Sequence, residues 1–154
     1  MTDDSLPARL APTMLSILRI VAALLFIEHG LSRLFGYPSP LPTPPLFTLY
    51  WFAGVIELAG GMLLTLGLFT RLAALIMSGE MAFAYFLSHA PNGFFPILNR
   101  GDAAILFCFV FLYIAFAGAG PWSLDARIGG ARERARAMQP AQESPAKAAG
   151  VARR

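Results

Sequence analysis

Residues 47–69 read FTLYWFAGVIELAGGMLLTLGLF, an apolar run that holds a single charged residue, Glu57. A helix needs about 20 apolar residues to cross a bilayer core of about 30 Å, and this run is long enough. Three further runs of the same kind occupy residues 14–35, 72–89 and 102–119. The sequence therefore predicts an all-α protein, a bundle of four transmembrane helices.

The composition also indicates a membrane protein. Only 14% of the 154 residues are charged and 56% are hydrophobic, and the mean hydropathy is +0.60. A soluble domain usually carries about 25% charged residues. The apolar runs leave no space for a soluble catalytic domain. We predict an N-terminal cytoplasmic segment at 1–13, a membrane domain at 14–128 whose first run is retained as a helix, and a basic, disordered cytoplasmic tail at 129–154.

Basic residues near the ends of the runs predict the orientation, because Lys and Arg in short flanks favour the cytoplasmic side. With both termini cytoplasmic, that side carries Arg9, Arg71 and the basic tail. The opposite side then carries only Arg33 and Arg100. This bias favours cytoplasmic termini and places the proline-rich segment 36–45 outside. Beside a membrane helix, a basic tail favours anionic lipid over nucleic acid as its partner.

Small residues lie beside the acid of the 47–69 run. Gly54, Glu57 and Gly61 share one helical face, and Gly60 lies next to them. Small residues let helices approach closely in lipid, so we expect this face to pack against a neighbouring helix. Gly30 indicates the same kind of contact in the first run. Glu57 must then point into a helix interface, either as a structural hydrogen-bonding group or as part of a site.

Each apolar run carries one acidic residue, and basic residues lie close to several of them. Charged groups in a membrane usually face the bundle interior and often mark a functional site. The candidates for a ligand-binding site or buried polar network are Arg19, Glu28, His29, Arg33, Glu57, Glu80, His89, Arg100 and Asp102. Most of them fall in the outer half of the bundle, with Arg19 near the inner side. We expect the following six to face one another: Arg19, His29, Arg33, Glu57, Glu80 and Asp102. A buried arginine would then pair with Glu57 or Glu80.

Several kinds of chemistry fit these residues. A polar pocket that opens outward could hold a small amphipathic molecule, such as a quinone head group bound by His, Arg and Glu. A packed network of structural ion pairs explains the same residues equally well. His29 and His89 also invite a bis-histidine haem, although two histidines alone are weak support. The spacing of histidines and cysteines predicts no metal site, and the single cysteine, Cys108, is typical of apolar packing.

Five short motifs, in this order and spacing, resemble the DoxX family. They are EHGLSRLFG at 28–36, ELAGG at 57–61, GLFTR at 67–71, NRGD at 99–102 and GAGPWSLD at 118–125. The resemblance extends from about Met14 to Ile128 and includes Arg19 ahead of the first motif. Its motif positions are Arg19, His29, Gly30, Arg33, Glu57, Gly61, Arg71 and Asp102. Family members often have Lys where this chain has Arg33 and Glu where it has Asp102.

The resemblance implies a bacterial inner-membrane protein of four helices, related to the DoxD-type subunit of thiosulfate:quinone oxidoreductase. It favours an accessory or quinone-binding subunit of a membrane redox or sulfur-linked system, with quinone as the cofactor and a redox protein as the partner. The sequence shows no redox centre of its own and identifies no catalytic residue. The alternative is a non-enzymatic role in small-solute permeation or in membrane assembly. A homo-oligomer is compatible with either role.

Overall fold

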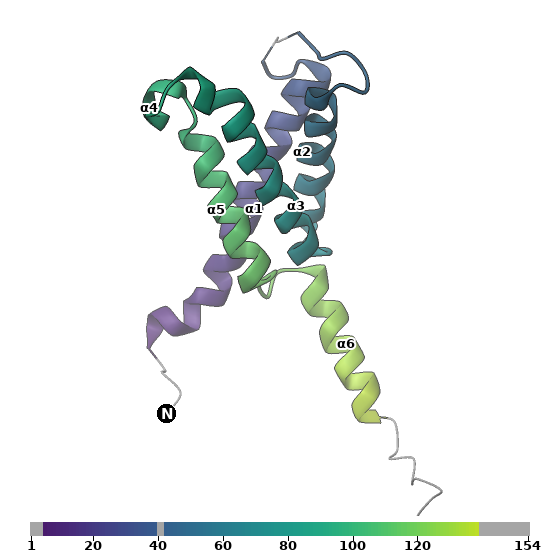
Figure 1. The fold of residues 1–154 in the computed structure, drawn as a ribbon. Coiled ribbons are helices and arrows are strands. Elements are labelled where there is room, and N and C mark those ends of the chain that lie inside the picture. Colours follow the sequence, from purple (N-terminus) through teal and green to yellow (C-terminus); the bar gives the residue numbers. More distant parts are fainter. Residues whose placement is uncertain (1–4, 40–41, 139–154) are drawn as a thin grey trace, which may run out of the picture.

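The computed structural model describes residues 5–39 and 42–138 (Figure 1). Within them the chain is helical and contains no strand. The long helices are α1 (Leu6–Phe35), α2 (Leu49–Leu66), α3 (Thr70–Ala84), α5 (Asp102–Ala117) and α6 (Leu124–Met138), and the short ones are the π-helix η1 (Tyr85–His89), the 3-10 helix η2 (Ala90–Asn92) and α4 (Pro96–Asn99). The prediction of an all-α fold is confirmed.

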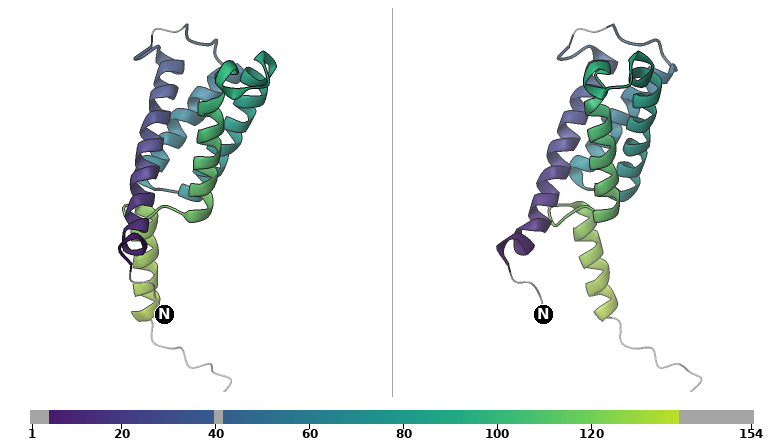
Figure 2. Two further views of the ribbon diagram at one scale, coloured as in Figure 1. Left: turned by 90° about the vertical axis from the view of Figure 1, so that its left-hand side faces the viewer. Right: turned by 60° about the vertical axis from the view of Figure 1, so that its left-hand side comes forward.

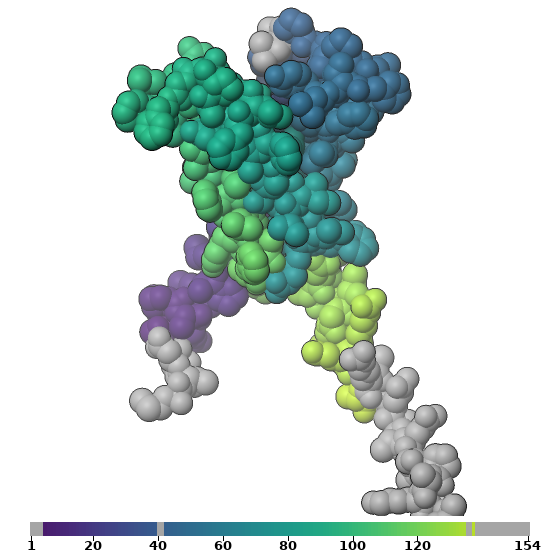
Figure 3. All heavy atoms as spheres, in the orientation of Figure 1, coloured from purple at the N-terminus to yellow at the C-terminus, as the bar shows by residue number. Residues whose placement is uncertain are grey.

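Four helices form the bundle as two pairs. α1 packs along α2 and α3 packs along α5 (Figure 1). The pairs meet near the start of α6 and separate toward the connection between α1 and α2, where the space-filling view shows a notch (Figure 3). We call the end that carries the α1–α2 connection the loop end. We call the opposite end, which holds the beginning of α1 and all of α6, the terminal end (Figure 2).

The lengths of the helices fit a membrane. Within the described residues, three segments are long and apolar enough to cross a bilayer: Leu6–Phe35, Leu49–Leu66 and Thr70–Asn92. α5 is apolar but has only 16 residues, which at 1.5 Å per residue span about 24 Å. Large apolar side chains such as Leu24, Phe83 and Phe109 lie exposed on the outside of the bundle, where lipid would cover them.

Two segments are more helical than the sequence predicts. α1 begins at Leu6 and not near Met14. Its first turns bend away from the bundle (Figure 1), and Pro12 explains the bend because proline cannot donate the helical hydrogen bond. α6 continues to Met138, so the part of the predicted tail up to that residue is a helix. The rest of the predicted disordered tail lies outside the described residues.

Glycines allow the close contact between helices. A Cβ at Gly30 would lie 2.7 Å from the backbone nitrogen of Leu58, and one at Gly61 would lie 2.6 Å from Ile27 Cγ1. Gly60 turns the other way, toward α3, where a Cβ would lie 2.6 Å from Met77 Sδ. The α1–α2 interface is therefore close enough for a side chain on one helix to reach the backbone of the other.

The close contact between α1 and α2 predicts that one added methyl group at Gly30 lowers the stability of the protein strongly. Gly30→Ala should destabilise the protein by about 1–3 kcal/mol, because the new Cβ meets backbone that cannot move aside. The matched control is Gly79→Ala in α3, since a Cβ there has no atom within 4 Å. Thermal unfolding in detergent should show a lower Tm for Gly30→Ala and an unchanged or higher Tm for Gly79→Ala. Equal stabilities would contradict the packing described here.

Candidate functional site

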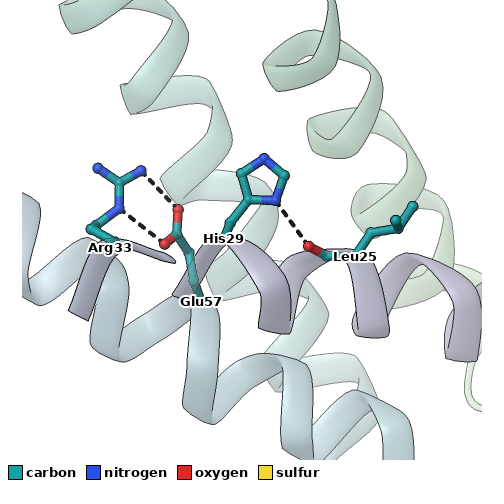
Figure 4. Close-up of polar contacts among 4 residues, drawn as sticks. All are labelled: Leu25, His29, Arg33 and Glu57. Carbon is teal, nitrogen blue, oxygen red and sulfur yellow. Dashed lines mark hydrogen bonds and ion pairs between the residues drawn. The ribbon is translucent and has the colours of Figure 1, made fainter. Parts of the chain in front are cut away.

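Arg33 and Glu57 form an ion pair between α1 and α2. The Arg33 Nε donates to Glu57 Oε2 and its Nη2 donates to Oε1, both at 3.0 Å (Figure 4). Glu57 is 1% exposed and Arg33 30% exposed. Gly54 gives the arginine room to cross, since a Cβ there would lie 3.2 Å from Arg33 Cδ. The partly exposed Arg33 thus pairs with Glu57, one of the two carboxylates that the sequence offered as its partner.

A cavity of about 320 Å³ lies between α2 and α3, beside this pair. We call it the α2–α3 pocket. Its wall contains three ionisable candidates from the sequence, Arg33, Glu80 and His89. The other lining residues are Leu49, Tyr50, Ala53, Phe83, Ala84, Leu87 and Ser88. The pocket therefore combines charged groups with aromatic and aliphatic side chains, as amphipathic ligands require.

Glu80 is the unusual group in this pocket. Both of its carboxyl oxygens are buried, and neither has a hydrogen-bond partner within the described residues. A buried polar group without a partner costs about 1–3 kcal/mol. The nearby cation, Arg33, already makes its two carboxylate bonds to Glu57. Glu80 can therefore accept or donate a hydrogen bond to a molecule in the pocket.

His89 reaches the same pocket from the π-helix η1. Its Nδ1 lies 3.0 Å from the carbonyl oxygen of Asn99. A carbonyl only accepts, so Nδ1 carries the proton and Nε2 is left for another partner. Asn99 is 4% exposed and is held by the backbone of Gly93 and Gly101. The connection before α5 thereby fixes the histidine ring.

Other predicted site residues lie away from this pocket. The His29 Nδ1 donates to the Leu25 carbonyl of its own helix, and Figure 4 shows the ring turned away from the Arg33–Glu57 pair. Glu28 and His29 line a smaller cavity with Pro38. Arg100 and Asp102 are exposed at the loop end. Since His29 and His89 line different cavities, the structure does not bring the two histidines to a common site.

Arg19 belongs to the terminal end and, among the residues that the structure describes, forms no ion pair with a carboxylate. It is fully buried. Its guanidinium donates to four backbone carbonyls, those of Leu64, Thr65, Ala119 and Trp122. The first two are at the end of α2 and the other two connect α5 with α6. The expectation that six ionisable residues face one another therefore fails for Arg19, because carbonyl oxygens at helix ends satisfy it instead.

Asp125 supports the same end of the bundle from α6. Its carboxylate accepts from the backbone N–H of Phe69 at 3.0 Å and of Thr70 at 2.9 Å, and so caps α3. Burial alone would raise the pKa of this carboxyl, but the hydrogen bonds from Thr70 and Phe69 and the charge of Arg19 hold the pKa below its usual value. The carboxylate form therefore stabilises the fold.

Asp125→Asn should lower the free energy of unfolding by about 1 kcal/mol at neutral pH, because the amide oxygen can accept only one of the two N–H groups and carries no charge. The folded-state pKa lies below the unfolded value of about 3.9. The cap is thus fully present above about pH 4 and is lost as the pH falls through the folded pKa. The difference between Asp125→Asn and wild type should shrink at pH 3. Glu133→Gln, an exposed change on α6, is the control. Unfolding in detergent at the two pH values measures both, and a difference independent of pH would contradict the assignment.

Two of these functional residues did not stand out in the sequence. Tyr50 lines the pocket and lies with its ring centroid 5.8 Å from Arg33 Cζ, but an aromatic residue in an apolar run is too common to be noticed. Asp125 lies within one of the five motifs, yet its partner is the backbone of residues 69 and 70, which no side-chain pattern shows.

Known proteins match the chain as follows. The DoxX family model matches residues 14–90. An uncharacterized protein of Haemophilus influenzae is 46% identical over 123 residues, which cover 74% of this chain and 90% of that protein. An uncharacterized membrane protein of Mycobacterium tuberculosis is 31% identical over 138 residues, which cover 76% of this chain and 82% of that protein. No solved structure gives a significant match. The chain belongs to the DoxX family.

Proposed function

We propose that the α2–α3 pocket binds the head group of a lipid-soluble quinone, and that the protein is a quinone-binding subunit of a membrane redox system. The observation that carries the proposal is Glu80, a carboxyl whose two buried oxygens have no partner within the described residues and which lines the pocket. A bound molecule with hydrogen-bonding oxygens would satisfy it.

The shape and chemistry of the pocket support a quinone. A quinone head group is a flat ring with carbonyl oxygens on opposite edges. A protonated Glu80 can donate to one carbonyl, and Arg33 or a protonated His89 can donate to the other. Tyr50 and Phe83 offer aromatic surfaces for the ring. The volume of about 320 Å³ lies at the lower end of the range of about 300–1,000 Å³ for ligand pockets.

The exposed apolar side chains at the rim of the pocket favour a ligand that enters from the lipid bilayer. Leu49 is 65% exposed, Phe83 70% and Leu87 56%. These side chains face outward between α2 and α3, where an apolar tail could lie along them in lipid. A water-soluble ligand would gain nothing from such a rim.

A bound quinone would supply two-electron redox chemistry. Within this chain, Glu80 can hold or release a proton beside the ring, while Arg33 keeps a positive charge next to it. A partner redox protein would supply the electrons. The proposal includes a bacterial inner membrane with both termini cytoplasmic, in agreement with the placement of α6 and the beginning of α1 at one end of the bundle.

The test is direct binding. Mass spectrometry of the lipid extract of the purified protein should find quinone in amounts close to one per chain. Titration of the quinone-depleted protein with a short-chain ubiquinone should give binding that Glu80→Leu weakens at least tenfold. Glu133→Gln, an exposed carboxylate on α6, should bind as wild type does. Unchanged binding in Glu80→Leu would refute the role of the pocket. A quinone-free protein that moves solutes across liposomes would favour the rival role in permeation.

A further inference from the structure

Two cavities meet at the same two residues. Arg33 and Tyr50 line the α2–α3 pocket and also a second cavity of about 340 Å³. The second cavity, which we call the loop-side cavity, is completed by His29, Ser32, Pro42 and Pro44. Its walls are thus α1, the start of α2 and the α1–α2 connection. Among the described residues, Arg33 and Tyr50 are the two that line both cavities.

The two cavities face different surroundings. The loop-side cavity is lined by His29 and Ser32 and lies at the loop end under a connection that leaves the bundle (Figure 1). We expect water to enter a cavity in this position. The α2–α3 pocket instead has a rim of exposed apolar side chains that lipid would cover. Arg33 and Tyr50 therefore form the wall between a cavity under the α1–α2 connection and a pocket whose rim is mainly apolar.

Of these two residues, Arg33 is fixed and Tyr50 is free to turn. Arg33 makes two bonds of 3.0 Å to Glu57. Tyr50 is the second residue of α2, is 53% exposed, and its hydroxyl makes no hydrogen bond within the described residues. Its ring contacts Arg33 through a cation–π arrangement at 5.8 Å, which is near the outer limit of about 6 Å for such contacts. A side-chain rotation of Tyr50 breaks no hydrogen bond.

Glu80 lies on the far side of this partition. The charged and titratable groups around it are Arg33 from α1, Glu57 and Tyr50 from α2, and His89 from η1. α5 also packs on α3 but adds no charged side chain to the pocket. A buried carboxyl changes its protonation state only by exchange with water or with another proton carrier. The loop-side cavity shares a wall with the α2–α3 pocket, so it is the nearest space from which we expect water to come.

We propose that Tyr50 gates a water path from the loop-side cavity into the α2–α3 pocket, so that Glu80 exchanges protons with the side of the membrane that the α1–α2 connection faces. The inference deepens the proposed function, since it concerns the proton supply of the same pocket. It requires no bound quinone, and its test can therefore fail or succeed independently of quinone binding.

The test is the accessibility of a cysteine in the pocket. A charged, membrane-impermeant methanethiosulfonate reagent reacts with thiolates, which form in water and not in lipid. In a Cys108→Ala background, Ala53→Cys places a thiol in the α2–α3 pocket. Phe52→Cys is the control at the same depth, because Phe52 is 49% exposed on the outside of α2. Ser39→Cys in the α1–α2 connection identifies the side of the membrane that the loop end faces, in intact cells and in inverted vesicles.

Ala53→Cys should react from the same side as Ser39→Cys, and at least tenfold faster than Phe52→Cys. Adding Tyr50→Ala should increase the rate at Ala53→Cys several-fold, whereas Tyr50→Phe, which keeps the ring, should leave the rate unchanged. Equal rates at positions 52 and 53, or reaction only from the side opposite to Ser39→Cys, would overturn the proposal. So would a rate at Ala53→Cys that is insensitive to Tyr50→Ala. If Tyr50→Ala does not fold, the comparison of positions 52 and 53 still decides whether water enters the pocket.

Discussion

Replacement of Glu57 by leucine is expected to destabilise the protein by about 3 kcal/mol and to abolish ligand binding in the α2–α3 pocket. Removal of one partner of a buried ion pair typically costs about 3–5 kcal/mol, because the other charge is left without compensation. The lower end of that range applies here, since Arg33 retains 30% exposure. The stranded guanidinium would also turn toward Glu80, the nearest free carboxyl, and so change the pocket itself.

Two further variants distinguish the effect of losing the Glu57 charge from the effect of changing the packing around it. Glu57→Gln keeps an acceptor for Arg33 and should preserve the fold, but it should remove any pH-dependent binding that depends on the carboxylate. The double variant Arg33→Met/Glu57→Leu replaces the pair with apolar groups and should recover part of the lost stability. Chemical unfolding in detergent and titration with a short-chain quinone measure the two effects. Full stability and full binding in Glu57→Leu would show that the pair has no role.

The second large effect is expected at Arg19. Arg19→Leu should destabilise the protein by about 3–5 kcal/mol, because four carbonyls lose their donor and each buried acceptor without a partner costs about 1–3 kcal/mol, partly recovered by rearrangement. Arg19→Lys should recover only part of the loss, since an ammonium lacks the planar fork of donors that reaches all four oxygens.

Arg71 provides the matched control for this prediction. Within the described part of the chain it also donates only to carbonyls, those of Ala115 and Phe116, but it is exposed. Water can replace its hydrogen bonds, so Arg71→Leu should cost less than about 1 kcal/mol. The same unfolding measurement compares the two substitutions. Equal losses at positions 19 and 71 would show that burial of the guanidinium is not the cause.

The sequence predicts most of the architecture because the relevant signals are local. Apolar length marks the membrane helices, and the spacing of Gly54, Glu57 and Gly61 identifies the face of α2 that contacts α1. That face also brings Glu57 to Arg33, so the ion pair could be predicted from helical geometry. The sequence could not show that Arg33 pairs with Glu57 and not with Glu80, because that depends on which helices lie side by side.

The remaining features depend on contacts that the side-chain pattern does not show. The acceptors of Arg19 are backbone carbonyls, and every residue has one, so no residue type marks them. α1 begins at Leu6, eight residues before the apolar run, within a segment whose hydropathy does not mark it as part of that helix. The α2–α3 pocket is lined by residues from α1, α2, α3 and η1, so it depends on the tertiary arrangement of helices that are far apart in the sequence.

The hydrogen bonds of Arg19 also fix the order in which the molecule can be completed during synthesis. The acceptors at Ala119 and Trp122 lie 100 and 103 residues after the arginine in the chain. α1 therefore enters the membrane with a guanidinium whose final partners have not yet been translated. A chain that stops before residue 119 would offer this guanidinium only the carbonyls of Leu64 and Thr65 and would leave its other two hydrogen bonds unmade.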